Sequence, residues 1–272
     1  MRIKLRLAAR AWGMLLAAAA VAAPSQAALA SYEGFGYSDG SLLNGQAGGS
    51  GWAASWNAGN PLATITANGL GYGALATTAG AATASAKPNP TGADITYEER
   101  QLAAGFGADG TSAYLSFLLR PEDGAGFYGG LNFGSLFIGK SGTTSTYGLE
   151  SGGGNIASSG VVAQTAATVF LVLHVQFQAG NDLIELFIDP TLGAPLPGLA
   201  DAVISNLDLA GSTVTINNAG AWTTDEIRLG DSLAAVTPTA LPEPSALLLL
   251  VSGLGVLSLV QRRRPMRARG RS

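Results

Sequence analysis

The 272-residue chain contains no cysteine and a single histidine, His174. The lack of thiols excludes disulfides, cysteine catalysis and thiolate metal sites, so the fold must be held together by its core. Basic residues are also scarce between Ser31 and Ala240, where five Lys and Arg stand against 17 Asp and Glu, a formal charge of −12. Because such a surface repels phosphate backbones, nucleic acid is not an expected partner.

The chain also lacks apolar runs of the roughly 20 residues that a transmembrane helix needs. Its first apolar run, residues 11–23, follows a basic segment over residues 1–10 and precedes small residues near Ala27 and Ala30. A basic start, a short apolar core and a small-residue end are typical of a secretory signal. We therefore predict a cleavable signal peptide with a signal helix over residues 1–30, cut after Ala27 or Ala30.

A second apolar run lies near the C-terminus. This region has three parts, which are Pro242, Glu243 and Pro244, an apolar stretch over 246–260, and a basic tail beginning with Arg262, Arg263 and Arg264. As a helix, the apolar stretch would be about 22 Å long, against a hydrocarbon core of about 30 Å. The arginines belong on the cytoplasmic side of a membrane, so the preceding domain would face the periplasm. The prolines keep their segment extended and accessible to a processing enzyme.

The C-terminal segment, residues 242–272, resembles the PEP-CTERM sorting signal of Gram-negative bacteria in the order and spacing of its three parts. The resemblance implies that exosortase recognises and cleaves the chain at or near Pro242, Glu243 and Pro244. It also implies a transient stay at the inner membrane and a destination on the cell surface or in an exopolysaccharide matrix. An ordinary tail anchor is the alternative, and the tail after Arg264 is longer than such signals usually have.

Alternating apolar residues predict short β-strands between the two terminal segments. The clearest are 169–178 and 183–189, which a turn at 179–182 joins into a β-hairpin. Further strands are predicted at 63–66, 81–86, 112–120, 127–133, 136–140, 147–150, 213–217 and 226–230. Many short strands with Gly-rich turns predict an all-β domain over residues 31–233, an antiparallel β-sandwich of the jelly-roll type. Residues 234–241, rich in Pro, Thr and Ala, are expected to be a linker.

Four short stretches of this domain, 116–120, 137–140, 180–182 and 225–230, resemble the concanavalin A-like and laminin-G-like jelly rolls. The resemblance implies two packed antiparallel sheets and, often, binding of carbohydrate or protein.

Three groups of residues are candidates for binding or catalysis. Trp52 and Trp56 could stack on sugar rings, but we interpret them as core residues. No Gly-x-Ser-x-Gly motif accompanies His174, which is expected to be a partly exposed strand residue. Glu185 and Asp189 would lie about 13 Å apart on one strand face, beyond the roughly 5–9.5 Å of a glycosidase carboxylate pair.

Loop carboxylates leave calcium binding as an open alternative, although no cofactor is required. The loop candidates are Asp109, Glu122, Asp123, Asn181 and Asp182. We interpret them as solvated surface residues, because no repeated Asp pattern specifies a site. No phosphate-binding loop or zinc-ligand cluster accompanies them.

The sequence thus favours an exported, non-enzymatic surface or biofilm-matrix protein that binds extracellular polysaccharide. The alternatives are an extracellular carbohydrate-active hydrolase on the same fold, and a purely structural domain.

Overall fold

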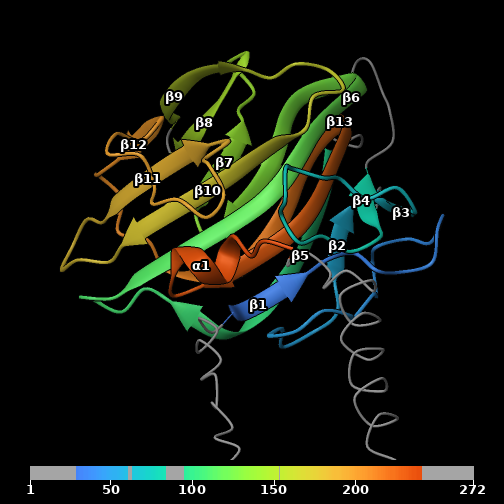
Figure 1. Cartoon of the computed structure of the whole chain (residues 1–272), viewed down its shortest axis with the longest axis horizontal. Helices are drawn as coiled ribbons and strands as arrows, with labels where there is room; N and C mark the ends of the chain where they lie inside the picture. Colours follow the sequence, from blue (N-terminus) through green and yellow to red (C-terminus); the bar gives the residue numbers. More distant parts are fainter. Residues whose placement is uncertain (1–28, 61–62, 84–94, 153, 241–272) are drawn as a thin grey trace, which may run out of the picture.

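Thirteen β-strands and one short helix make up the part of the chain that the computed structural model describes, residues 29–60, 63–83, 95–152 and 154–240 (Figure 1). The strands are β1 (Leu29–Glu33), β2 (Asn57–Asn60), β3 (Thr64–Thr66), β4 (Ala81–Thr83), β5 (Ile95–Phe106), β6 (Ser112–Phe133), β7 (Leu136–Lys140), β8 (Thr146–Ser151), β9 (Asn155–Val162), β10 (Val169–Gln176), β11 (Leu183–Ile188), β12 (Ala202–Ile204) and β13 (Gly211–Gly230), and the helix is α1 (Leu233–Val236). The pairings between these strands are antiparallel. The predicted all-β class is therefore confirmed.

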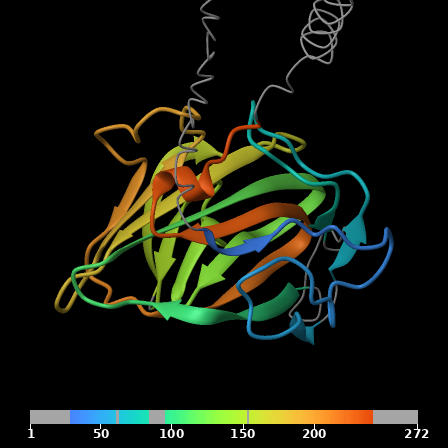
Figure 2. The same cartoon turned by 60° about the horizontal axis from the view of Figure 1, so that its bottom comes forward.

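The two longest strands, β6 and β13, pass through both layers of the sandwich and curve between them (Figures 1 and 2). The first half of β6 and the second half of β13 form sheet A together with β12, β11, β10, β1, β4 and β3. Their other halves form sheet B together with β9, β8, β7, β5 and β2. Register shifts between Asn218 and Trp222 mark the bend of β13, as bulges re-aim a strand.

At the bend, the Trp222 ring packs directly on the backbone of β6. A Cβ atom at Gly129 would lie 2.1 Å from that ring, so a side chain is excluded there. The buried Trp222 also donates a hydrogen bond from Nε1 to the Ala219 carbonyl, at 3.1 Å. A small residue on one strand and a large one on the other thus close the corner between the two sheets.

The main core lies between sheets A and B. Alternate residues of β6 and β10, including Leu115, Phe117, Leu171 and Leu173, supply its sheet A side and are fully or almost fully buried. Leu131, Ile138, Leu149, Val214 and Ile216 supply its sheet B side. Burying such side chains contributes about 1.5–3 kcal/mol each to the free energy of unfolding. This layer therefore holds the two sheets together without disulfides.

A smaller core covers the opposite face of sheet A. Phe170, Val172 and Leu118 point outward from this sheet and pack beneath Leu70 and Leu75. Other apolar residues of the covering segments also pack against this cluster, namely Tyr72, Leu192, Leu196, Ala200 and Leu233. Sheet A is thus covered on both faces, and the outer face of sheet B carries no comparable layer among the described residues.

The predicted hairpin is confirmed, since β10 and β11 pair from Leu171 with Ile188 to Gln176 with Leu183. In two other places, the sequence predicted two separate strands where the structure has one continuous strand. The predicted strands 112–120 and 127–133 are one strand, β6, and 213–217 and 226–230 are both part of β13. Pro121 and Gly124 lie between the two predicted segments, and the strand continues through them.

Residues 234–240, expected to be part of a linker, pack on the outer face of sheet A. Val236 is fully buried, and its carbonyl accepts a hydrogen bond from Ser116 Oγ at 2.6 Å. Thr239 bridges to Leu75, and the Ala240 amide donates to the Ala74 carbonyl. Residues 234–240 are therefore in contact with the domain up to the last described residue.

The predicted signal helix and the C-terminal hydrophobic helix lie outside the described residues. Within the described ranges, no helix is long and apolar enough to cross a membrane.

Candidate functional site

A row of side chains crosses the outer face of sheet B. Residues that pair across neighbouring strands point to the same face. The register links one residue from each of six strands in the row, Asn57, Glu99, Thr215, Asn132, Phe137 and Glu150. Polar groups thus dominate an outer face whose reverse side is the apolar core.

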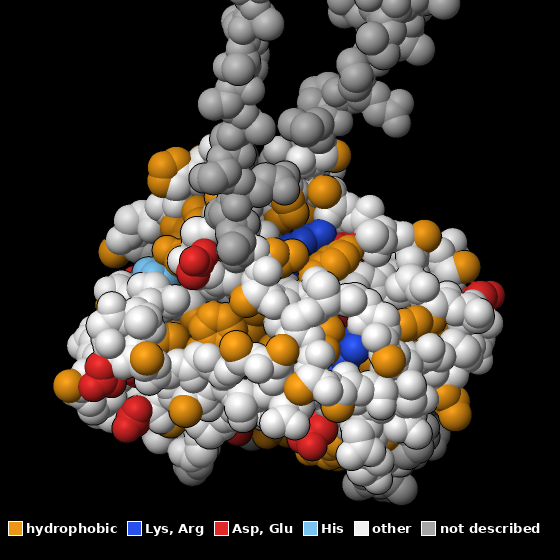
Figure 3. Space-filling model, turned by 90° about the horizontal axis from the view of Figure 1, so that it is seen from below, with side chains coloured by type: hydrophobic (Ala, Val, Ile, Leu, Met, Phe, Trp, Pro, Cys, Tyr) orange, Lys and Arg blue, Asp and Glu red, His pale blue; other side chains and the backbone are white. Residues whose placement is uncertain are grey.

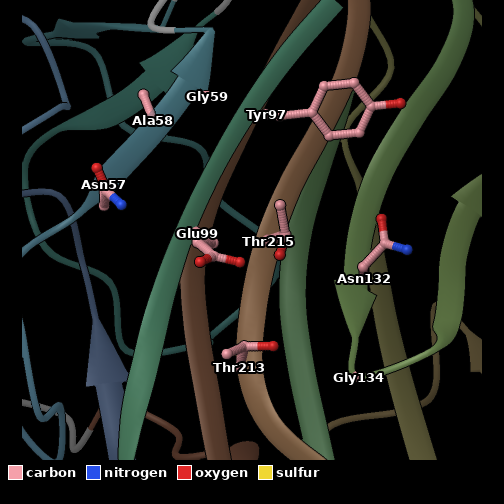
Figure 4. Close-up of a pocket in the computed structure, with 9 residues that line it drawn as sticks. All are labelled: Asn57, Ala58, Gly59, Tyr97, Glu99, Asn132, Gly134, Thr213 and Thr215. Carbon is pink, nitrogen blue, oxygen red and sulfur yellow. The ribbon is translucent and has the colours of Figure 1, made fainter.

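The β2 side of this row borders a hollow of about 540 Å³. Its lining residues come from β2, β5, β6 and β13 and from the turn after β6, and they are Asn57, Ala58, Gly59, Tyr97, Glu99, Asn132, Gly134, Thr213 and Thr215. Figure 4 shows the Tyr97 ring reaching from β5 toward Asn132, with Glu99 and the two threonines below it. The volume falls within the range of about 300–1,000 Å³ that is common for ligand sites.

A second hollow, of about 270 Å³, continues the first toward β8 and shares Tyr97 and Asn132 with it. Its other lining residues are Tyr128, Ser135, Phe137, Glu150, Ser151, Gly152 and Asn217. We refer to the two hollows together as the groove. Because its lining strands lie side by side, the groove crosses the strands instead of following one of them.

Glycines keep part of this face free of side chains. Gly130, Gly139 and Gly148 pair with one another across β6, β7 and β8, next to Asn217 of β13. A Cβ atom at any of them would lie 2.1–2.2 Å from a backbone oxygen of the adjacent strand. A side chain is therefore excluded at each of these three positions.

Two hydrogen-bond acceptors in the groove have no partner among the described residues, and they are Glu150 Oε2 and Asn217 Oδ1. The rest of each group is engaged. Tyr128 donates its hydroxyl to Glu150 Oε1 at 3.3 Å, and Asn217 Nδ2 donates to Asn132 Oδ1 at 3.1 Å. Burial, with the adjacent Glu150 charge, raises the pKa of Tyr128, so its hydroxyl stays a donor at neutral pH.

A buried polar cluster fixes β5 from behind the groove. Alternate residues of β5 face opposite sides of the sheet, so Glu99 is exposed while Glu98 and Arg100 point inward. Arg100 is paired with Glu33, and its guanidinium lies 5.0 Å from the Trp52 ring. Glu33 also accepts a hydrogen bond from Trp56 Nε1 at 3.0 Å. Through these contacts the cluster holds the strand that carries Tyr97 and Glu99.

The two carboxylates of the groove are far apart. Glu99 lies on β5 and Glu150 on β8. Three strands, β13, β6 and β7, lie between them in the sheet. Four strand spacings of about 4.8 Å separate them by roughly 19 Å. Glycosidase carboxylate pairs lie about 5–9.5 Å apart, so these two cannot form such a pair.

The structure places the predicted candidates elsewhere. Trp56 is 1% exposed and Trp52 packs against it, which confirms their interpretation as core residues. His174 is partly exposed, as expected. It stacks on Tyr114 with 4.4 Å between ring centroids, and its Nδ1 lies 3.1 Å from Glu185 Oε2.

The predicted carboxylate candidates have separate structural contacts. Asp189 accepts a hydrogen bond from the Phe170 amide instead of joining Glu185. Asp182 accepts from the amides of Gln178 and Leu209 and is 2% exposed. In the described ranges, no group of three or more His, Asp or Glu side chains could hold a metal ion. Calcium binding through Asp109, Glu122 or the other loop candidates stays an alternative.

The predicted sorting residues, Pro242, Glu243 and Pro244 with Arg262, Arg263 and Arg264, lie outside the described residues and stay predictions.

Sequence reasoning missed the groove because it missed β5. On this strand Tyr97, Glu99 and Gln101 face outward, while Glu98 and Arg100 occupy the inward positions. Charges on both faces hide the apolar alternation that identifies a strand. The alternation of Tyr97, Glu99 and Gln101 was the one feature that could have indicated this strand. The inward position of Arg100 is explained by its pairing with Glu33, which is 67 residues away in the sequence.

No family model matches this chain, and no curated protein matches it. Solved structures do match. An endo-1,3-β-glucanase from Streptomyces sioyaensis is 11% identical with a TM-score of 0.45, covering 76% of this chain and 97% of that one. Domain 4 of an extracellular arabinanase from Geobacillus stearothermophilus, in complex with arabinotriose, is 13% identical with a TM-score of 0.40, covering 74% and 98%.

An alginate lyase of polysaccharide lyase family 7 is 9% identical with a TM-score of 0.38, covering 75% of this chain and 95% of that one. At these identities the likeness concerns the fold alone. The matched structures include a glucanase and an alginate lyase. The expectation that this chain is not an enzyme is corrected, because the lack of a sequence motif does not support it. That expectation rested on the lack of a catalytic motif, whereas the groove is assembled from residues dispersed over several strands.

Proposed function

We propose that this chain is an extracellular carbohydrate-active protein whose groove binds a polysaccharide. One observation carries the proposal: the groove combines exposed Tyr97 with hydroxyl, amide and carboxylate groups across sheet B. Aromatic faces pack against the apolar faces of sugar rings, and the surrounding polar groups can hydrogen-bond to their hydroxyls. Few other ligands offer apolar faces and dense hydroxyls together.

The length of the groove supports a polymeric ligand. Its lining runs from β2 to β8 over six adjacent strands. Five strand spacings of about 4.8 Å give roughly 24 Å, which exceeds the size of a single sugar. A chain of several sugars lying across the strands would fill the groove.

Cleavage of the bound chain is a second proposal, favoured by the position of Glu99. This carboxylate is exposed in the larger hollow, and Tyr97 lies two residues along the same face of β5. A spacing of two residues on a strand is about 7 Å. Glu99 could therefore act as the base that takes a proton from an attacking water, whose oxygen bonds to the anomeric carbon while the glycosidic bond breaks and the leaving oxygen takes up a proton. Glu150 is too distant to complete a two-carboxylate mechanism with Glu99.

Binding is tested by titrating the purified full chain with a panel of soluble polysaccharides in a calorimeter. We expect Tyr97→Ala to weaken binding about tenfold, because a stacked ring contributes about 0.5–1.5 kcal/mol beyond its buried area. Tyr97→Phe should keep most of the affinity. Phe127→Ala is the matched control, since Phe127 is 59% exposed and does not line the groove. Equal affinities for Tyr97→Ala and the original chain would reject the proposal.

Cleavage is tested on any polysaccharide that binds, by measuring new reducing ends and unsaturated sugar products. Glu99→Gln should lower the rate by about 10²–10⁴, the usual contribution of a general acid or base. Its affinity should stay within about threefold, because a glutamine preserves the shape of the side chain. The adjacent Glu98→Gln is the control, because Glu98 faces the core. An unchanged rate in Glu99→Gln would reject its role, and a bound polysaccharide that yields no product would reject cleavage.

We also propose the route by which the protein reaches its ligand. Export through the segment 1–30, followed by exosortase processing near Pro242, would take it from the inner membrane to the surface or matrix of a Gram-negative cell. The sequence of the terminal segments supports this route. Fractionation of cells with and without exosortase, with mass spectrometry of the mature C-terminus, tests it. Identical termini and fractions in both strains would reject exosortase processing.

A further inference from the structure

We infer that the groove selects a neutral polysaccharide over one that carries carboxylate or sulfate groups. The inference rests on the proposed binding function and adds the chemical class of the ligand. It follows from the charges and from the donors and acceptors that line the groove.

The charged residues lining the groove are both acidic, Glu99 and Glu150. They lie near its two ends, so a chain bound along the whole groove would contact both. A like charge within a few ångströms weakens binding, and the weakening grows where water is excluded. A polysaccharide with a negative group on each sugar could not avoid these positions.

The basic residues of the described domain are directed elsewhere. Arg100 points to the core side of β5 and pairs with buried Glu33, and Lys140 donates to the carbonyl of Phe127 at 2.7 Å. Arg120 pairs with Glu122, and Arg228 is 2% exposed. None of these four lines either hollow. Among the residues that the structure describes, the groove therefore offers an anionic ligand no counter-charge.

The net charge of the whole domain also disfavours anionic ligands. Residues 31–240 carry a formal charge of −12, and Figure 3 shows acidic side chains (red) spread over one face of the molecule with little blue among them. Such a domain repels polyanions before contact, at low ionic strength above all. A neutral chain does not experience this repulsion.

The unpaired acceptors give an independent reason. Glu150 Oε2 and Asn217 Oδ1 are buried and lack a donor within the described residues, and both side chains line the smaller hollow. A buried acceptor without a donor is costly, so a ligand that supplies donors gains affinity there. Sugar hydroxyls can donate, whereas ionised carboxylates and sulfates can only accept. At these two acceptors a hydroxyl is thus favoured over a charged substituent.

The test compares neutral laminarin, arabinan and mixed-linkage β-glucan with anionic alginate, polygalacturonate and a sulfated galactan, by calorimetry on the full chain. We expect a neutral polymer to bind at least about tenfold more tightly than any anionic one at low salt. Added salt should change the neutral affinity little and raise the anionic affinity. The double variant Glu99→Gln, Glu150→Gln should gain at least about tenfold in affinity for anionic chains, because it removes both carboxylates from the groove.

Two outcomes separate the inference from the function on which it rests. Anionic chains that bind as tightly as neutral ones, and that lose affinity in Tyr97→Ala, would overturn the neutral class and leave the groove as the site. Binding that Tyr97→Ala does not weaken, or no binding to any polymer of the panel, would overturn the proposed function and the inference together. The salt series on the original chain makes the test independent of whether the double variant folds.

Discussion

Glu98 makes the free energy of unfolding depend on pH in a direction opposite to that of most carboxylates. Its side chain is fully buried behind β5, where Oε1 accepts a hydrogen bond from the Ala63 amide at 3.0 Å. Oε2 has no partner among the described residues. Burial raises the pKa of Glu98 from 4.5 to about 7, and the Ala63 amide opposes this only partly. The folded chain therefore holds this proton more tightly than the unfolded chain does.

The sign follows from proton linkage. Because the folded-state pKa is raised, the contribution of Glu98 to stability is fully present below about pH 4.5 and is lost as the pH rises through about 7. A shift from 4.5 to about 7 corresponds at most to about 3 kcal/mol, at 1.36 kcal/mol per pKa unit. We expect Glu98→Gln to remove most of this dependence, because an amide keeps the acceptor for Ala63 and does not titrate. At pH 8 the variant should be about 2 kcal/mol more stable than the original chain.

The assay is urea unfolding at a series of pH values from 4.5 to 8.5, with the free energy of unfolding extrapolated to water. Glu99→Gln is the matched control, because this neighbour is exposed on the opposite face of the strand and should change stability by less than about 0.5 kcal/mol. Asp225, whose pKa burial raises to about 8, gives both chains a further loss of stability at higher pH. The comparison is therefore the difference between the two curves. Parallel curves between pH 5 and 8 would refute a raised pKa at Glu98.

Two substitutions and one truncation test the packing of the fold. Arg100→Met leaves Glu33 buried without its partner, so it should lower the free energy of unfolding by about 3–5 kcal/mol, and a loss below 1 kcal/mol in urea unfolding would contradict the pairing. Gly139→Ala places a Cβ atom 2.2 Å from a backbone oxygen of the adjacent strand at φ +144°, and should cost about 1–3 kcal/mol, whereas unchanged stability would contradict this geometry. A chain that stops after Ser232 loses the buried Val236 and should melt about 5 °C lower than one that keeps α1. Equal melting temperatures would contradict a contribution of α1 to stability.

The sequence predicts this fold where one face of a strand is apolar. The alternation in β10 and β11 identifies their hairpin because Leu171 and Leu173 share a face that is buried. The prediction fails where burial involves charge, as on β5, whose inward Arg100 is satisfied by a residue far away in the chain. The prediction also fails at Pro121, where β6 continues although two strands were expected. Whether a proline ends a strand depends on its neighbours in the sheet.

The groove could be predicted even less well than the fold. Its residues come from several strands and become neighbours only through the register of sheet B, as Glu99, Thr215 and Asn132 show. Each alone is an ordinary polar residue on a strand. A sequence pattern can identify a site whose residues are close in the chain, and here the spacing in the chain carries no such information.

Both ends of the described chain lie at sheet A, away from the groove. Leu29 pairs with Gly230 at the edge of that sheet, and Ala240 is bound to Ala74 in the layer that covers it (Figure 1). The groove occupies the outer face of sheet B, with the whole core between. A label, a bead or a fused partner attached at Leu29 or Ala240 would therefore lie across the core from the groove, and molecules immobilised through either residue would present their grooves outward as an array.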